Sequence, residues 1–391
     1  MFNFKIKSFE FNLRELAGSL GDFGTLFPLA IGYIVVCKLN PSGFLVMMGL
    51  VNIVSGLIYK IPMPLQPKKA VAVYAISQSW NPSMVYSCGI SLGLFWLFLS
   101  FTGFIEKIVK YTPKCVVRGI QISLGIMLGF LGYSMISQSA IFIEGWGLGI
   151  ISLIIIVFLQ KNKCAPAAIV LLILGILISN LKGDLSGKIN FSISFPSIFI
   201  PNIKEIGQAF LLAGISQIPL TLTNAVIASA ALIKEYFPER AVSEKKLLIN
   251  QAAMNLVVPF FGGMPMCHGA GGLAGQYYFG ARTGGANIME GLIEIFLGIF
   301  LSTSIVAIFS VFPKSIVGAM LLMVGISLLK FAKDVKGTTI EIISMIITIV
   351  ISVLTKNMAI GFGSGVVFYY ASKKIKTIFN KKTSYNRLTA K

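Results

Sequence analysis

The chain has 391 residues, of which 55% are hydrophobic and only 12% are charged, and its mean hydropathy is +0.84. This composition lies outside that of soluble globular proteins and indicates a membrane protein with many spans. The formal net charge of +19 does not point to nucleic acid, because the basic residues lie in short loops and at the C-terminus. Residues 1–15 mix acidic and basic side chains without a continuous apolar core, so we expect no cleavable signal there.

Apolar segments that suit a transmembrane helix occur about fourteen times, if shorter broken helices are allowed. The first seven are Ala17–Cys37, Pro41–Tyr59, Met63–Ser79, Met84–Ile105, Lys114–Ile136, Trp146–Leu159 and Pro166–Ser179. The second seven are Gly207–Ile233, Leu247–Phe261, Pro265–Phe279, Asn287–Phe309, Lys314–Leu329, Ile340–Leu354 and Met358–Ser372. We therefore predict an all-α polytopic membrane protein in contact with lipid.

Basic residues distinguish the two sides of this map. Most of the 33 lysines and arginines fall in alternate connections, including the N-terminus, residues 234–246 and the tail from Lys373. Because cytoplasmic loops are enriched in Lys and Arg, both termini are predicted to be cytoplasmic. The expected location is the plasma membrane.

The longest polar connection, Lys182 to Glu205, divides the chain into similar halves. We place the first repeat at residues 1–190 and the second at residues 191–391, with about seven spans in each. An odd number of spans makes the second half enter from the opposite side, which is the inverted-repeat arrangement of many secondary transporters.

The third span contains Pro62, Pro64 and Pro67, which prevent a regular helix across that stretch. A half-helix is therefore expected to start near Pro67, with unpaired first-turn N–H groups that attract an anion. Lys68 and Lys69 lie beside this start, and a charge inside a span suggests function. Alternatively, either lysine reaches to the cytoplasmic interface.

The tenth span has a similar interruption in the other half. Pro265 and the only histidine, His268, precede a glycine-rich run whose backbone amides could approach a ligand closely. Small-residue helix packing is the alternative. Next to an anion, His268 would be a candidate site for a coupling proton.

No metal site is predicted, because Cys267 and His268 lack two further credible ligands. The chain shows neither a nucleotide-binding loop nor a catalytic triad, so we expect no cofactor and no enzyme. The run Gly361–Gly365 lacks the context of a dinucleotide fold and is interpreted as helix packing.

Three acidic residues lie well inside predicted spans: Asp22, Glu290 and Glu294. They serve either structural pairing or proton coupling, and Asp22 is favoured for coupling because its helix is broken by glycines. Glu290 and Glu294 share one helix face. Around Pro219, polar side chains such as Gln217 and Thr223 either bind a ligand's oxygens or fasten a broken helix.

Four motifs resemble the molybdate transporter family, a branch of the sulfate permease superfamily. They are G-D-F-G-T-L-F-P (Gly21–Pro28), P-M-P-L-Q-P-K-K-A (Pro62–Ala70), I-P-L-T-L-T-N-A-V-I-A (Ile218–Ala228) and M-P-M-C-H-G-A-G-G-L-A-G-Q-Y-Y-F-G-A-R-T-G (Met264–Gly284). The family usually has Met where this chain has Lys68, and an extra cation there could retune anion preference. There is no room after the last span for a regulatory domain, so the basic end is expected to be only a tail.

The resemblance implies a core domain of spans 1–4 and 8–11 and a gate domain of spans 5–7 and 12–14, which often dimerises. The substrate would lie between the starts of spans 3 and 10, and the core would slide against the gate in an elevator motion. The substrate-binding residues implied are Gln66, Lys68, Lys69, His268, Gly269, Ala270, Gly271, Thr25, Gln217 and Thr223. Arg282 is expected to brace the cytoplasmic end.

The predicted function is import of molybdate, coupled to protons or another cation. Sulfate or general divalent-oxyanion transport is the nearest alternative, and tungstate is a related substrate. A uracil-type carrier would be expected to place carboxylates where Lys69 and His268 stand. An anion channel, or a membrane enzyme using His268 as a base, is a further alternative.

Overall fold

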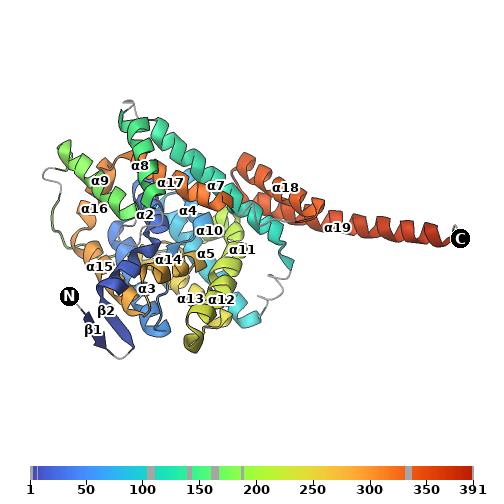
Figure 1. Cartoon of the computed structure of the whole chain (residues 1–391), viewed down its shortest axis with the longest axis horizontal. Coiled ribbons are helices and arrows are strands. Elements are labelled where there is room, and N and C mark those ends of the chain that lie inside the picture. The colour runs from blue at the N-terminus through green and yellow to red at the C-terminus, as the bar shows by residue number, and fades with distance from the viewer. Residues whose placement is uncertain are drawn as a thin grey trace.

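The computed structural model describes residues 3–6, 8–103, 111–138, 143–159, 167–185, 189–330 and 337–389. Within these ranges, the side chains of Asn3, Phe4, Asp22, Thr25, Ile143 and Ala168 and those after residue 376 are not described. The predicted span ends at Ile105 and Pro166 also lie outside them. The described chain is mainly helical (Figure 1).

The helices of the first half follow the predicted spans closely in position. They are α1 (Leu13–Ser19), α2 (Phe23–Ile31), α3 (Pro41–Tyr59), α4 (Lys69–Ser77), α5 (Pro82–Thr102), α7 (Lys114–Ser137), α8 (Leu148–Leu159) and α9 (Ala167–Leu181). A 3-10 turn joins α1 to α2, which ends in a π-helical turn.

The second half repeats this pattern with more interruptions. Its helices are α10 (Ile203–Ala209), α11 (Ile215–Leu220), α12 (Ser229–Tyr236), α13 (Glu244–Val257), α14 (Ala270–Phe279), α15 (Gly285–Phe300), α16 (Ser302–Val311), α17 (Lys314–Leu329), α18 (Thr339–Thr355) and α19 (Met358–Thr389). Helices α10 to α12 and the π-helical turns between them form one span of 34 residues, with Pro219 inside it.

Helix starts obey local capping rules. Asn40 and Asn81 precede α3 and α5, and each side-chain oxygen accepts a backbone N–H of the first turn, at 2.9 Å. A proline at the first helical position follows each asparagine, where its missing N–H costs nothing. These two starts are therefore fixed by sequence alone.

Three features differ from the sequence predictions. The predicted span Asn287–Phe309 is two helices, α15 and α16, bent by 87°. The last predicted span, Met358–Ser372, belongs to a longer helix, because the backbone of α19 stays helical to Thr389 and projects from the body (Figure 1). The chain is not purely α-helical, since two strand pairs occur: β1 (Asn3–Ile6) with β2 (Phe9–Asn12), and β3 (Gln66–Pro67) with β4 (Met266–Cys267).

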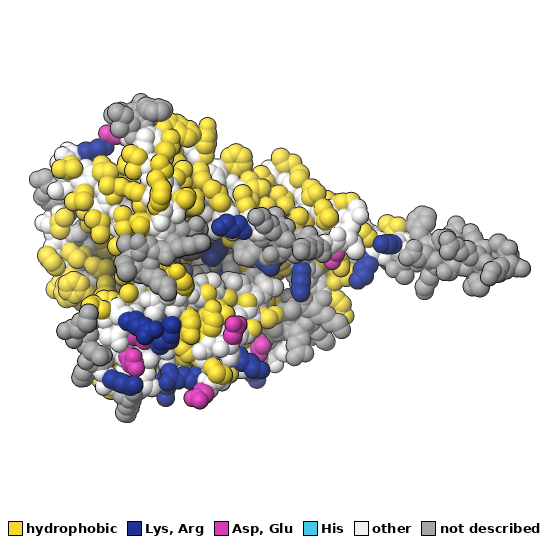
Figure 2. All heavy atoms as spheres, in the orientation of Figure 1, with side chains coloured by type: hydrophobic (Ala, Val, Ile, Leu, Met, Phe, Trp, Pro, Cys, Tyr) yellow, Lys and Arg dark blue, Asp and Glu magenta, His cyan; other side chains and the backbone are white. Residues whose placement is uncertain are grey.

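Four described helices are each long and apolar enough to cross a membrane, or five if the bent pair counts as one span. Hydrophobic side chains cover the upper part of the face shown in Figure 2, and charged side chains gather along its lower edge. Large apolar residues such as Phe101 and Phe158, each more than 80% exposed, would be costly in water. The exposed apolar surface is that of an integral membrane protein.

Helix pairs pack through glycines. Helix α3 lies along α15, α5 along α13 and α7 along α17. A methyl group on Gly125 of α7 would lie 2.7 Å from the carbonyl oxygen of Gly325, and one on Gly325 would lie 2.6 Å from that of Gly125. Absent side chains let these backbones touch, which is how helices associate where lipid removes the hydrophobic driving force.

Candidate functional site

Two extended segments about two hundred residues apart cross at the centre of the site. Strand β3 pairs antiparallel with β4, so that Gln66 faces Cys267 and Pro67 faces Met266. The N–H of Lys68 extends the ribbon by donating to the carbonyl of Pro265, at 3.0 Å. All four strand residues are buried.

Each strand leads into a short helix, and the antiparallel pairing sends the two helices in opposite directions. Helix α4 begins at Lys69 and α14 at Ala270. The predicted start near Pro67 is two residues early, because Pro67 belongs to the strand. The positive ends of both helix dipoles therefore meet at the ribbon.

Two buried asparagines clamp the crossing segments. Asn255 of α13 exchanges two hydrogen bonds with the peptide of Met266, at 2.8 and 3.1 Å. Asn287 of α15 does the same with the peptide of Met63, at 2.7 and 2.8 Å. Sequence reasoning missed both residues, although an asparagine within an apolar span is a usable signal.

The starts of α4 and α14 differ from those of α3 and α5. Their N-cap residues, Lys68 and Gly269, make no side-chain capping bond. Instead, the Oε1 atom of Gln217 accepts the N–H of Ala70 at 2.9 Å, and the Gln217 amide donates to Thr221. Polar side chains from another span thus reach the helix start.

Gly269 has a steric reason to be glycine. A methyl group there would lie 2.7 Å from Oε1 of Gln66 and 3.5 Å from Nδ2 of Asn224. The structure therefore brings Gln66, Gly269 and Asn224 together, and Gln217 lies at the other helix start. Asn224 is one of the polar residues around Pro219 for which the sequence left ligand binding and fastening of the broken helix as alternatives.

The side chain of Lys68 contacts two neighbouring helices. Its side chain is fully buried, its Nζ donates to Oε1 of Gln251 at 3.1 Å, and it lies 5.6 Å from the ring centroid of Trp96. Those partners lie on α13 and α5, so this placement favours a structural brace. It does not reach an aqueous interface as the alternative supposed. Lys69, the first residue of α4, is partly exposed.

His268 is fully buried beside the ribbon. Its Nδ1 lies 3.0 Å from the carbonyl oxygen of Pro64, and its ring meets that of Tyr59 edge-on, with centroids 5.8 Å apart. Tyr59 belongs to a small apolar cluster with Ile61 and Leu273. The imidazole therefore supports the crossing segment, while its backbone leads into Gly269.

The remaining predicted residues are spread around this centre. Thr223 donates its hydroxyl to the carbonyl of Pro219 at 2.8 Å, and Gly271 has open space where a side chain would be. Arg282 lies beyond α14, where its guanidinium stacks 3.6 Å from the ring centroid of Tyr277. The side chains of Asp22 and Thr25 lie outside the described residues.

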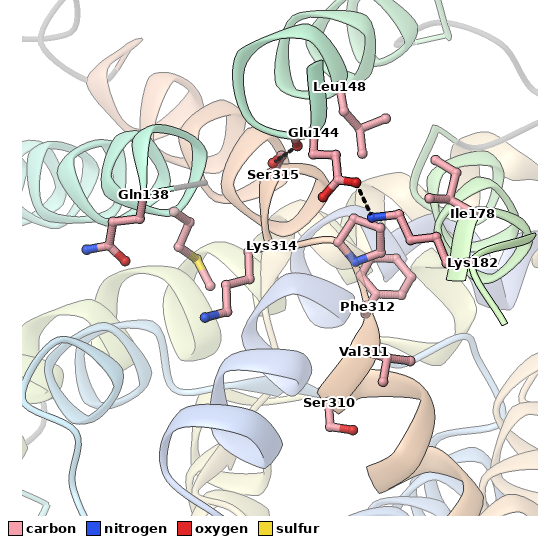
Figure 3. Close-up of a pocket in the computed structure, with 12 residues that line it drawn as sticks. Gln138, Glu144, Leu148, Ile178, Lys182, Ser310, Val311, Phe312, Lys314 and Ser315 are labelled. Carbon is pink, nitrogen blue, oxygen red and sulfur yellow. Dashed lines mark hydrogen bonds and ion pairs between the residues drawn. The ribbon is translucent and has the colours of Figure 1, made fainter. Parts of the chain in front are cut away.

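Glu290 and Glu294 are buried on one face of α15 and line an otherwise apolar cavity of about 330 Å³. A second cavity, of about 380 Å³, lies among α7, α9 and α17 (Figure 3). There Lys182 and Glu144 form an ion pair of 2.7 Å, and Lys314 extends from the wall. No cluster of three metal-ligating side chains occurs among the described residues.

The fold, with two half-helices that start from a crossed strand pair, is similar to that of solved membrane transporters. The superposition on the transmembrane domain of a cyanobacterial bicarbonate transporter, BicA, covers 90% of this chain and 97% of the BicA chain. Its TM-score is 0.67, and the sequence identity is 16%. The superposition on the structure of SLC26A9 covers 96% of this chain and 66% of the SLC26A9 chain. Its TM-score is 0.70, and the sequence identity is 13%. These similarities show the fold.

The sequence identifies the family within that class. Residues 14–128 and 209–328 match the family described as "Molybdate transporter of MFS superfamily". Molybdate transporter 2 of Arabidopsis thaliana is 32% identical over 405 aligned positions, which cover 92% of this chain and 87% of the relative. The chain belongs to the molybdate transporter family, as its motifs predicted, and its relatives are transporters.

Proposed function

We propose that this protein imports molybdate across the plasma membrane, with both termini in the cytoplasm. The observation that carries the proposal is the meeting of two helix N-termini at the β3–β4 ribbon, where neither N-cap side chain satisfies the first turn. Such ends present N–H groups and a positive dipole to an anion. Membership of the molybdate transporter family supports molybdate as the substrate.

The site chemistry suits a tetrahedral oxyanion. Gln66 and Asn224 flank Gly269, whose missing side chain lets the Gln66 side chain approach the start of α14. Lys69 adds a positive charge at the start of α4, and Gln217 orients the first turn through Ala70. A dianion would exchange its hydration shell for these donors. Backbone donors recognise shape and charge, so tungstate and sulfate are natural competitors.

The helix pairs support two inverted repeats of about seven spans each. In this arrangement a twofold axis through the antiparallel ribbon would exchange β3 with β4 and α4 with α14. The same operation would exchange the α3–α15 pair with the α5–α13 pair, and α7 with α17. We place the core in spans 1–4 and 8–11 and the gate in spans 5–7 and 12–14, and propose that the core slides against a dimerising gate.

Import requires an energy source. Moving a dianion into a negative interior costs about 2.3 kcal/mol per charge per 100 mV, or roughly 4.6 kcal/mol for two charges. Uphill uptake therefore needs a co-transported cation.

The test is uptake by purified protein in proteoliposomes. We expect saturable molybdate uptake that Gln66→Leu abolishes and Thr223→Val preserves within about twofold, because the Thr223 hydroxyl proton is already donated to Pro219. Both variants should match the wild type in folded yield. Absence of saturable uptake under any cation gradient refutes the function, and sulfate uptake at equal or greater efficiency favours the general oxyanion carrier.

A further inference from the structure

A buried chain of hydrogen bonds connects the α15 carboxylate of Glu294 to the crossing segment. Oε2 of Glu294 accepts from Nδ2 of Asn52 at 2.8 Å, and Oδ1 of Asn52 accepts from Nδ2 of Asn287, also at 2.8 Å. Asn287 holds the peptide of Met63, three residues before Gln66. The carboxylate is thus linked to the segment that positions the proposed substrate site.

The donors and acceptors in this series of hydrogen bonds can be assigned in only one way. Asn287 must turn Oδ1 toward the N–H of Met63, so its Nδ2 donates to Asn52. Asn52 must then accept with Oδ1 and donate with Nδ2, which makes Oε2 of Glu294 an acceptor. A proton on Glu294 is therefore confined to Oε1.

Oε1 is suited to gain and lose that proton. Glu294 is only 4% exposed, and among the described residues no hydrogen-bond partner contacts Oε1. Glu294 lines the cavity formed by the α1–α2 turn, α2, α3, α9, α15 and α16, where Glu290 is the other titratable side chain described. Among the described residues that line this cavity there is no lysine, arginine or histidine. The side chain of Asp22 is not among the described residues. Burying an ionised carboxylate without a cation is costly, which favours proton uptake.

We propose that Oε1 of Glu294 binds the proton that is co-transported with the anion, an inference that rests on the transport function above. The proton comes from the outer aqueous phase, forms an O–H bond with the carboxylate and leaves to the cytoplasm, so charge and atoms balance. Protonation removes a negative charge from the core that carries the dianion. It also converts the Asn52 bond from a charge-assisted one to a neutral one, which is about half as strong.

The test compares wild type, Glu294→Gln and Glu294→Asp in proteoliposomes. Glutamine keeps the acceptor for Asn52 and places an NH₂ where the protonated Oε1 would be. In the wild type, a gradient of one pH unit, acid outside, should raise the steady-state accumulation of molybdate about tenfold for each coupled proton. Glu294→Gln should show molybdate–molybdate exchange within about threefold of wild type but no response to the pH gradient. Glu294→Asp should keep the response.

Glu239→Gln is the matched control, because Glu239 is exposed on a surface turn and should leave both readouts unchanged. Three results overturn the proposal: wild-type exchange without a pH response, a pH response that survives in Glu294→Gln, or folded Glu294→Gln without exchange. A response lost in Asp22→Asn but kept in Glu294→Gln would assign the proton to Asp22. Failure of the proposed function is separate, since wild-type protein would then show no saturable exchange.

Discussion

Replacement of Lys68 by methionine, the residue usual in the family, tests whether this lysine touches the anion. Its amine donates to Gln251 on α13 at 3.1 Å and lies over Trp96 on α5, so both of these partners belong to helices other than α4 and α14. We therefore expect Lys68→Met to leave molybdate KM and competition by sulfate within about twofold of wild type.

The two roles of Lys68 predict effects of very different size on anion binding. A lysine 4 Å from an anion contributes about 4 kcal/mol per unit charge at an effective dielectric constant of 20, and its loss would weaken binding about a thousandfold. A brace instead affects stability, because Gln251 would be left with a buried, unsatisfied oxygen at a cost of about 1–3 kcal/mol. The melting temperature in detergent should fall in Lys68→Met and recover in Lys68→Met with Gln251→Leu.

Competition assays with radiolabelled molybdate give the answer directly. Lys69→Gln is the matched variant, because that neighbouring lysine is partly exposed at the first position of α4 and should raise KM at least tenfold. A large rise in KM, or a changed preference between sulfate and molybdate, in Lys68→Met would refute the brace.

Three further predictions concern other parts of the molecule. Gln217→Ala removes the acceptor of the Ala70 N–H and should raise molybdate KM about tenfold, measured by uptake, while an unchanged KM would remove Gln217 from the site. Gly125→Leu should abolish folded yield in detergent because α7 and α17 touch there, whereas Gly129→Leu on the same helix meets open space and should fold; equal yields would contradict that contact. Glu15, which precedes the predicted first span, has its pKa raised by burial, although the backbone N–H groups of residues 282 and 283 oppose this. The folded protein thus binds the proton more tightly than the unfolded chain, so stability should fall as pH rises above about 4.5. Thermal unfolding across pH should show this slope, and Glu15→Gln should flatten it; an identical slope in the variant would count against the burial effect.

The positions of the helices could be predicted because lipid imposes a simple length requirement. Helices α3, α5 and α17 start within two residues of the predicted segments. The 87° turn between α15 and α16 could not be predicted, because no proline marks Leu301. Apolar composition alone does not show in which direction a helix runs. A helix lying along a membrane surface and one crossing it can have the same composition over ten residues.

The backbone of the candidate site could be predicted from the sequence, but the directions of its side chains could not. Proline and glycine interruptions located the half-helices, since those residues act through the main chain. Lys68 and His268 were predicted to bind the anion, and that role stays a prediction; the structure adds that both are fully buried, with Lys68 bonded to Gln251 and His268 beside the carbonyl of Pro64. Where a side chain points depends on the backbone angles of the residues between strand and helix, which are Lys68 in one segment and His268 and Gly269 in the other. Neither composition nor spacing encodes these angles.

The antiparallel ribbon has an electrical consequence. Helices α4 and α14 meet with like ends, so their macrodipoles oppose and largely cancel. If the ribbon and its helices travel together across the electric field, the pair contributes almost no gating charge. The membrane voltage then acts on the bound anion and on whatever ions accompany it, and the protein can concentrate positive potential at its centre without making its own movement voltage-dependent.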